Sequence, residues 1–97
     1  MVLPDVLRIL RQLSGTSPTH GALRGAMGPI FSMIQAAHPN GVGVTDIPPH
    51  TAPLQMIHGW IIATLVNLVI IEGGNDSQMT EMSSLLGVFF PSVSTIS

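Results

Sequence analysis

The side chains best suited to chemistry in this chain are its four histidines, at positions 20, 38, 50 and 58. Imidazole binds transition metals and exchanges protons near neutral pH, so clustered histidines would predict a metal site or a general base. No two of the four stand three or four residues apart, the spacing that puts side chains on one helix face. We therefore predict no metal site, because one would need histidines to converge from distant segments.

His58 lies inside an apolar segment, and we interpret it as a core or interface histidine. A pH-sensing role is the alternative, because charging an imidazole in apolar surroundings is costly.

Sequence patterns typical of enzymes are absent from the chain. It contains no P-loop, nucleophile elbow, Cys-His zinc spacing or Gly-rich dinucleotide fingerprint. It also has no cysteine, no tyrosine and only five acidic residues, so acid-base catalysis lacks its usual side chains. The sequence predicts a protein that is not an enzyme, with no catalytic residue and no cofactor.

Charge is scarce and unevenly placed. Only 8 % of residues are charged, against roughly a quarter in ordinary soluble domains. The three basic residues, all before residue 25, are Arg8, Arg11 and Arg24. Phosphate binding needs a denser basic patch, so nucleic acid is not an expected partner. The acidic residues after position 45 are Asp46, Glu72, Asp76 and Glu81. Scattered solvated charge is the simpler interpretation, and head-to-tail attraction between copies is the alternative.

Hydrophobic spacing predicts helices in the first part of the chain. Residues 3–13 carry an apolar stripe at helical spacing, and Gly15 is a plausible stop. Ser17-Pro18 then resembles a helix start. Because Pro29 cannot donate a backbone hydrogen bond, we expect two pieces, about 18–27 and 29–37, either kinked or separated at Gly28-Pro29.

The second part of the chain predicts two more helices. Thr51 can cap a helix over about 52–72, closed by Gly73-Gly74. A further helix follows, with Asn75 or Asp76 as its N-cap. The expected apolar face of that last helix is formed by Met79, Met82, Leu86 and Phe89.

Leu54–Ile71, eighteen residues without a formal charge, could cross a membrane, form a bundle core or lie between copies of the protein. At about 1.5 Å per residue it falls just short of a bilayer core of about 30 Å. Polar residues such as Gln55 and Asn67 would cost free energy in lipid, and no lysine or arginine flanks the segment. We therefore favour a core helix, covered by neighbours on every side.

The predicted fold is a soluble all-α, single-domain bundle of four or five helices around a central apolar helix at about 52–72. Residues 1–91 should form the helical domain, and residues 92–97 a frayed C-terminal tail. The predicted core residues are Leu3, Leu7, Leu10, Ile30, Ile34, Trp60, Ile61, Leu65, Leu68, Leu86 and Phe89.

Two short segments resemble a known family. His50-Thr51-Ala52-Pro53-Leu54-Gln55-Met56-Ile57 is similar to His-x-Ala-x-x-Gln-Met plus an aliphatic residue in the N-terminal domain of lentiviral and retroviral Gag capsid proteins. Pro29-Ile30-Phe31-Ser32-Met33-Ile34 resembles that family's Pro-Met-Phe-Ser-Ala-Leu. The chain departs from the family at Trp60-Ile61-Ile62, where the family has a polar helix, and lacks its C-terminal-domain motif. The resemblance implies a helical, non-catalytic shell subunit that self-assembles, located inside the cell or in the virion.

The stretch His38–His50 is the longest without a helical pattern, and long loops are often functional. The residues predicted for interaction are Asn40, Gly41, Asp46, Pro48, Pro49, His50, Met79 and Met82. We expect a structural protein that binds itself. One alternative is an adaptor that takes a partner's helix or peptide in an apolar groove, with methionines 27, 33, 79 and 82 as adaptable contacts. The other alternative is a small single-span membrane protein.

Overall fold

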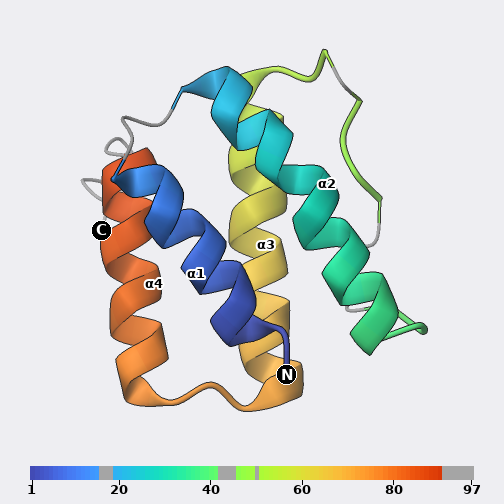
Figure 1. The fold of residues 1–97 in the computed structure, drawn as a ribbon, viewed down its shortest axis with the longest axis vertical. Coiled ribbons are helices and arrows are strands. Elements are labelled where there is room, and N and C mark those ends of the chain that lie inside the picture. The colour runs from blue at the N-terminus through green and yellow to red at the C-terminus, as the bar shows by residue number, and fades with distance from the viewer. Residues whose placement is uncertain (16–18, 42–45, 50, 91–97) are drawn as a thin grey trace.

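The computed structural model describes residues 1–15, 19–41, 46–49 and 51–90. Within these residues the chain forms four helices and no strand. The helices are α1 (Leu3–Ser14), α2 (His20–Ala37), α3 (Leu54–Glu72) and α4 (Asp76–Phe89) (Figure 1). The predicted all-α bundle is therefore confirmed. The frayed tail predicted at residues 92–97 lies outside the described residues.

Two helices hold the bundle together. α1 and α3 each pack against all three other helices, whereas α2 and α4 do not pack against each other. Figure 1 shows α2 and α4 on opposite sides of this central pair. The predicted central helix, α3, thus shares its position with the shorter and more polar α1.

α1 forms where its sequence predicts it, with Leu3, Val6, Leu7 and Leu10 buried against the rest of the bundle. Pro4 lies in the first turn, where its fixed φ suits the helix and its missing N–H removes no bond. The N-cap residue supplies no side-chain acceptor to the first backbone N–H groups. That acceptor comes from the far end of α3, as described below.

The structure of α2 differs from the prediction of two pieces that meet at Gly28-Pro29. The helix continues through Pro29, so the separation into two pieces is wrong, while the alternative of a kink at Gly28-Pro29 stays a prediction. Pro29 is exposed, and water can therefore reach the backbone carbonyl that the proline leaves unpaired. Ile30 and Ile34, directly after it, are buried and hold the second half of the helix against the core. The start is also shifted: the expected cap at Ser17-Pro18 lies outside the described residues, and Thr19 accepts from the backbone N–H of Ala22.

At the two ends of α3, one prediction from the sequence is wrong and one is confirmed. Thr51 does not cap it; α3 begins after Pro53, which contributes no side-chain acceptor. At the other end Gly73 adopts the left-handed conformation, with φ of 65°, that favours glycine. Asn75 then starts α4 through a reciprocal capping box with Gln78, as one of the two predicted caps.

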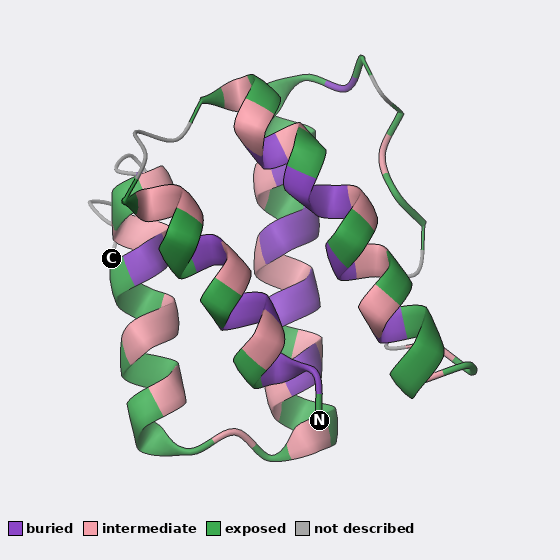
Figure 2. Ribbon diagram, viewed as in Figure 1, coloured by how far each residue is buried: buried purple, intermediate pink, exposed green. Residues whose placement is uncertain are grey.

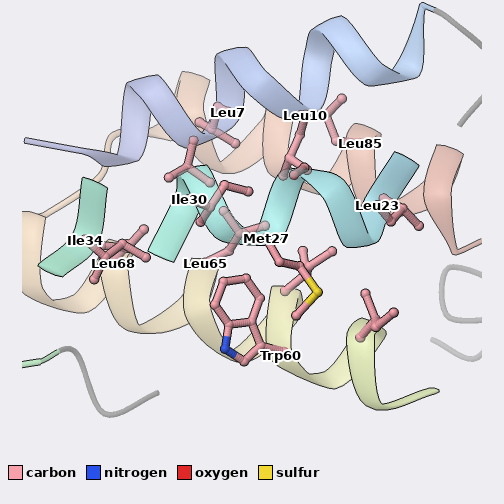
Figure 3. Packing of buried hydrophobic residues seen from close by; sticks show 14 of the residues in the cluster. Leu7, Leu10, Leu23, Met27, Ile30, Ile34, Trp60, Leu65, Leu68 and Leu85 are labelled. Carbon is pink, nitrogen blue, oxygen red and sulfur yellow. The ribbon is translucent and has the colours of Figure 1, made fainter. Parts of the chain in front are cut away.

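The core fills the space between α1, α2 and α3, where Figure 3 shows Leu7, Ile30, Met27, Leu65 and Trp60 packed together. Nine of the eleven predicted core residues are buried. The other two, Leu86 and Phe89, are half-buried, and Leu85 and Phe90 are buried in their place.

This difference is a rotation of α4. Glu81 forms an ion pair with Arg11 of α1, and Leu85 lies one turn farther along the same face. The rotation places Leu85 in the core and leaves Met79, at the edge of the expected apolar face, exposed.

The expectation that neighbours cover α3 on every side is wrong. Its buried residues are Ile57, Trp60, Ile61, Thr64, Leu65 and Leu68, which form one face only. Figure 2 shows this alternation of buried and exposed residues along the helices. Three neighbours are too few to surround a helix of 19 residues, so its opposite face meets solvent.

Candidate functional site

The solvent-facing side of α3 is the largest departure from an ordinary soluble surface. We define the outer face of α3 as Met56, Gly59, Ala63, Val66 and Ile70, which alternate in spacings of three and four residues. Met56, Val66 and Ile70 are 48 %, 45 % and 73 % exposed. Spacings of three and four form one continuous stripe along a helix, so these side chains make a single apolar strip.

The shape and chemistry of this strip suit contact with another helix. It contains no charged residue. Its centre is formed by Gly59 and Ala63, small residues that let another backbone approach closely. A Cβ added at Gly59 would meet nothing within 4 Å, so the space above it is open. Leu54 and Ile71, near the two ends of α3, are also exposed but point away from this strip.

Sequence reasoning missed the outer face because it assigned all of α3 to the core. The signal was present: apolar residues lie on all sides of α3, with only scattered polar ones such as Gln55 and Asn67, whereas α1 has a clear polar side. α3 is also the one described helix long and apolar enough to cross a membrane, and 33 % of its apolar window is buried within the bundle.

The predicted interaction residues do not form one surface. Gly41 has φ of 84°, in the left-handed region, at a turn where its N–H donates to the carbonyl of His38. Asn40, Asp46 and Pro49 are exposed, and Pro48 is half-buried. His50 lies outside the described residues. This loop runs along the α2 side of the molecule, away from α4 and its methionines (Figure 1).

The methionines predicted as adaptable contacts are dispersed. Met79 is exposed at the start of α4, while Met82 is half-buried against the core. Met27 is buried and Met33 half-buried, both in α2. A groove of about 350 Å³ does lie between α1 and α2, but no methionine lines it. Its walls are Ile9, Gln12, Leu13, Ala22, Gly25 and Ala26.

Glu72, at the end of α3, joins three helices. Its carboxylate accepts from the backbone N–H groups of Val2 and Leu3 at 2.9–3.0 Å, where α1 begins. It also contacts Nε2 of His38, the C-cap residue of α2, at 2.5 Å. Burial raises the pKa of this carboxyl, but the hydrogen bonds from His38, Val2 and Leu3 outweigh burial and hold the pKa below its ordinary value. A carboxylate at a helix N-terminus is also favoured by the helix dipole.

His58 lies on α3, at the opposite end of the helix from Glu72. Its ring packs against Phe90, with the two ring centroids 3.7 Å apart. Burial lowers the pKa of His58, and repulsion from His20 lowers it further. The Nε2 atoms of both histidines are buried without a hydrogen-bond partner. The lowered pKa favours the neutral form of His58, whose ring packs at the junction of α3 and α4.

Basic residues near the start of the chain and acidic residues near its end partly pair with each other within one molecule. Arg11 forms a fork to Glu81, with Nε–Oε2 and Nη2–Oε1 distances of 2.5 and 3.0 Å. This pair joins α1 to α4, and it raises the pKa of Arg11 and lowers that of Glu81. Arg8 pairs with Asp5 on the surface of α1. An arginine from the first part of the chain thus already has an acidic partner from the last part.

Among residues 1–15, 19–41, 46–49 and 51–90, no three histidine or acidic side chains lie close enough together to hold a metal ion. Comparisons with protein-family models, curated proteins and solved structures find no match for this chain.

Proposed function

We propose that this chain is a non-catalytic structural protein that binds a second copy of itself through the outer face of α3. The observation that carries the proposal is the uncharged strip from Met56 to Ile70, with small residues at its centre and exposed aliphatic side chains on either side. Covering a continuous exposed apolar surface with another apolar surface lowers the free energy, because both are removed from water.

A second copy suits the strip because the strip is compatible with two-fold pairing. In an antiparallel pair of α3 helices centred near Ile61, Gly59 meets Ala63 of the other copy and Met56 meets Val66. A two-fold interface brings the same patch together from both subunits, so both small residues lie at the crossing point and both large residues flank it. Because the strip has no charge, like charges do not oppose each other across the pair.

The more specific form of this proposal is a Gag-type shell subunit. Its support is the resemblance of residues 50–57 and 29–34 to capsid proteins. A shell needs more than one contact surface, and the exposed Val88 of α4 and the loop residues Asp46 and Pro49 are candidates for the others.

A membrane span is the second candidate, because α3 has a mean hydropathy of 1.9 over its apolar window. It is less favoured, since the six inner-face residues of α3 already pack into a core with α1 and α2. Leaving the bundle would expose the apolar stripe of α1 that packs beside them.

Sedimentation velocity over a dilution series tests the proposal. The unchanged chain should show dimers or larger species that dissociate on dilution. Val66→Glu places a charge opposite Met56 of the other copy and should shift the midpoint of dissociation to at least tenfold higher protein concentration, because burying an unpaired charge costs several kcal/mol. Gln35→Glu, an equal charge change on the exposed side of α2, should leave the midpoint unchanged.

Two outcomes would contradict the proposal. One is a chain that stays monomeric at every concentration. The other is a chain that co-floats with lipid vesicles and precipitates when no vesicles or detergent are present, which would support the membrane span.

A further inference from the structure

A second feature, on a different side of the molecule, is a small cavity between α2 and the loop before α3. Its volume is about 230 Å³. The residues that line it are Arg24, Met27, Gly28, Ile47, Pro48 and Pro49. Among the described residues that line it, Arg24 is the one with a charge, and the others are glycine or apolar.

Arg24 differs from the other two arginines of the chain in its partners. Arg8 and Arg11 each have a carboxylate, from Asp5 and Glu81. Arg24 has none in the part of the chain that the structure describes; its Nη2 donates to the backbone carbonyl of Ala52 at 3.0 Å. Its Nε is buried and has no acceptor. Arg24 therefore lines the cavity with a positive charge that no carboxylate of the described residues offsets.

We propose that this cavity binds a carboxylate on a short apolar group, through the guanidinium of Arg24. The planar guanidinium offers parallel N–H groups that match the two oxygens of a carboxylate. One positive charge neutralises a monoanion, whereas a phosphate dianion would leave net charge among apolar walls. The cavity is also smaller than the roughly 300–1,000 Å³ of sites for drug-sized ligands. Met27, Ile47 and Pro48 then surround the apolar part of the ligand.

The carboxylate has two possible sources, a small monocarboxylic acid or an acidic side chain of a second copy. Asp76 is the stronger candidate in the second case. It is exposed and has no ion-pair partner among the described residues, and it begins α4, on the far side of the molecule from α2 (Figure 1). Only the Asp76 of another copy can therefore reach the cavity.

The three arginines make nuclear magnetic resonance a direct test, because each Nε–H gives its own signal. Titration with propionate should shift the Arg24 Nε–H signal saturably, while the Arg8 signal moves little. Propionamide, which has the same shape and no charge, should cause no such shift. Arg24→Lys, which keeps the charge but loses the fork, should weaken propionate binding about tenfold or more; because this variant has no Arg24 Nε–H, binding is followed there through the methyl signal of Met27.

To identify the source of the carboxylate, the protein is diluted without added acid and the Arg24 Nε–H signal is followed. An Arg24 signal that moves on dilution of the chain, and no longer does so in Asp76→Asn, assigns the site to a second copy. A signal that moves only with propionate assigns it to a small acid. The proposal is overturned if neither treatment shifts the Arg24 signal, or if propionate shifts all three arginines equally and without saturation. The titration of the unchanged chain decides this even where the Arg24→Lys variant does not fold.

Discussion

The two faces of α3 have similar apolar side chains and very different surroundings. The inner face, from Ile57 to Leu68, packs into the core with α1 and α2. The outer face, from Met56 to Ile70, is open to solvent within one chain. The inner face is followed by Glu72, which binds backbone N–H groups of α1, whereas the outer face has no comparable polar partner. The same helix therefore stabilises the monomer on one side and offers a surface for association on the other.

The sharpest way to test this comparison is a pair of neighbouring residues. Leu65 is fully buried, and Val66, the next residue, is 45 % exposed. Leu65→Ala should lower the free energy of unfolding by about 2–5 kcal/mol, because it leaves a cavity in the core. Val66→Ala should lower it by less than about 1 kcal/mol when the protein is dilute enough to be monomeric. Urea denaturation of both variants measures the difference. Equal losses would show that the outer face is covered in the folded monomer.

Substitution of Glu72 tests how much its hydrogen bonds stabilise the end of the inner face of α3. Its carboxyl has a depressed pKa in the folded chain, so its contribution to stability is fully present above the ordinary carboxyl pKa of about 4.3 and is lost as the pH falls through the folded value. Glu72→Gln should lower the free energy of unfolding at pH 7 by about 1–3 kcal/mol, because hydrogen bonds to a charged acceptor are replaced by weaker ones.

Thermal unfolding between pH 7 and pH 3 measures this effect. The difference between Glu72→Gln and the unchanged chain should shrink as the pH falls below about 4.3. A constant difference over that range would mean that the charge of Glu72 is not what stabilises the junction. Asp46→Asn, at an exposed site outside the helices, is the matched control and should show little change at pH 7.

The smallest expected effect concerns the one polar residue of the inner face. Thr64 is buried, and its hydroxyl has no hydrogen-bond partner. Thr64→Val replaces that hydroxyl with a methyl group of similar shape, and should raise the free energy of unfolding by up to about 1 kcal/mol. Calorimetry at one protein concentration measures the change. A loss of stability would indicate that a bound water satisfies Thr64 in solution.

Local signals in the sequence were sufficient to predict most of the helices. The apolar stripe of α1, the glycine at the end of α3 and the Asn75 cap of α4 are each contained in a few neighbouring residues. The predictions failed where the outcome depended on a distant segment. The rotation of α4 depends on its packing against α1, which puts Leu85 in the core. α2 continues through Pro29 because Ile30 and Ile34 pack against the core.

The candidate interaction sites were less predictable than the helices. The composition of the loop around Asp46 predicts an interaction site, and the structure places Pro48 and Pro49 beside Arg24. Sequence spacing gives no reason to group Arg24 with this loop. Nothing local indicates that Arg24 lacks a carboxylate while Arg11 has one, since that depends on which helices meet.

The sequence by itself determined an all-helical chain with too little charge to cover its own surface. Helix propensity, capping and hydrophobic spacing act over a few residues, and composition needs no structure at all. Only the tertiary structure decided which side of α3 is buried, because that helix has apolar residues on every side and no amphipathic pattern to orient it. The choice came from α1, α2 and α4, whose narrower apolar faces cover one side of α3 and leave Met56, Val66 and Ile70 exposed.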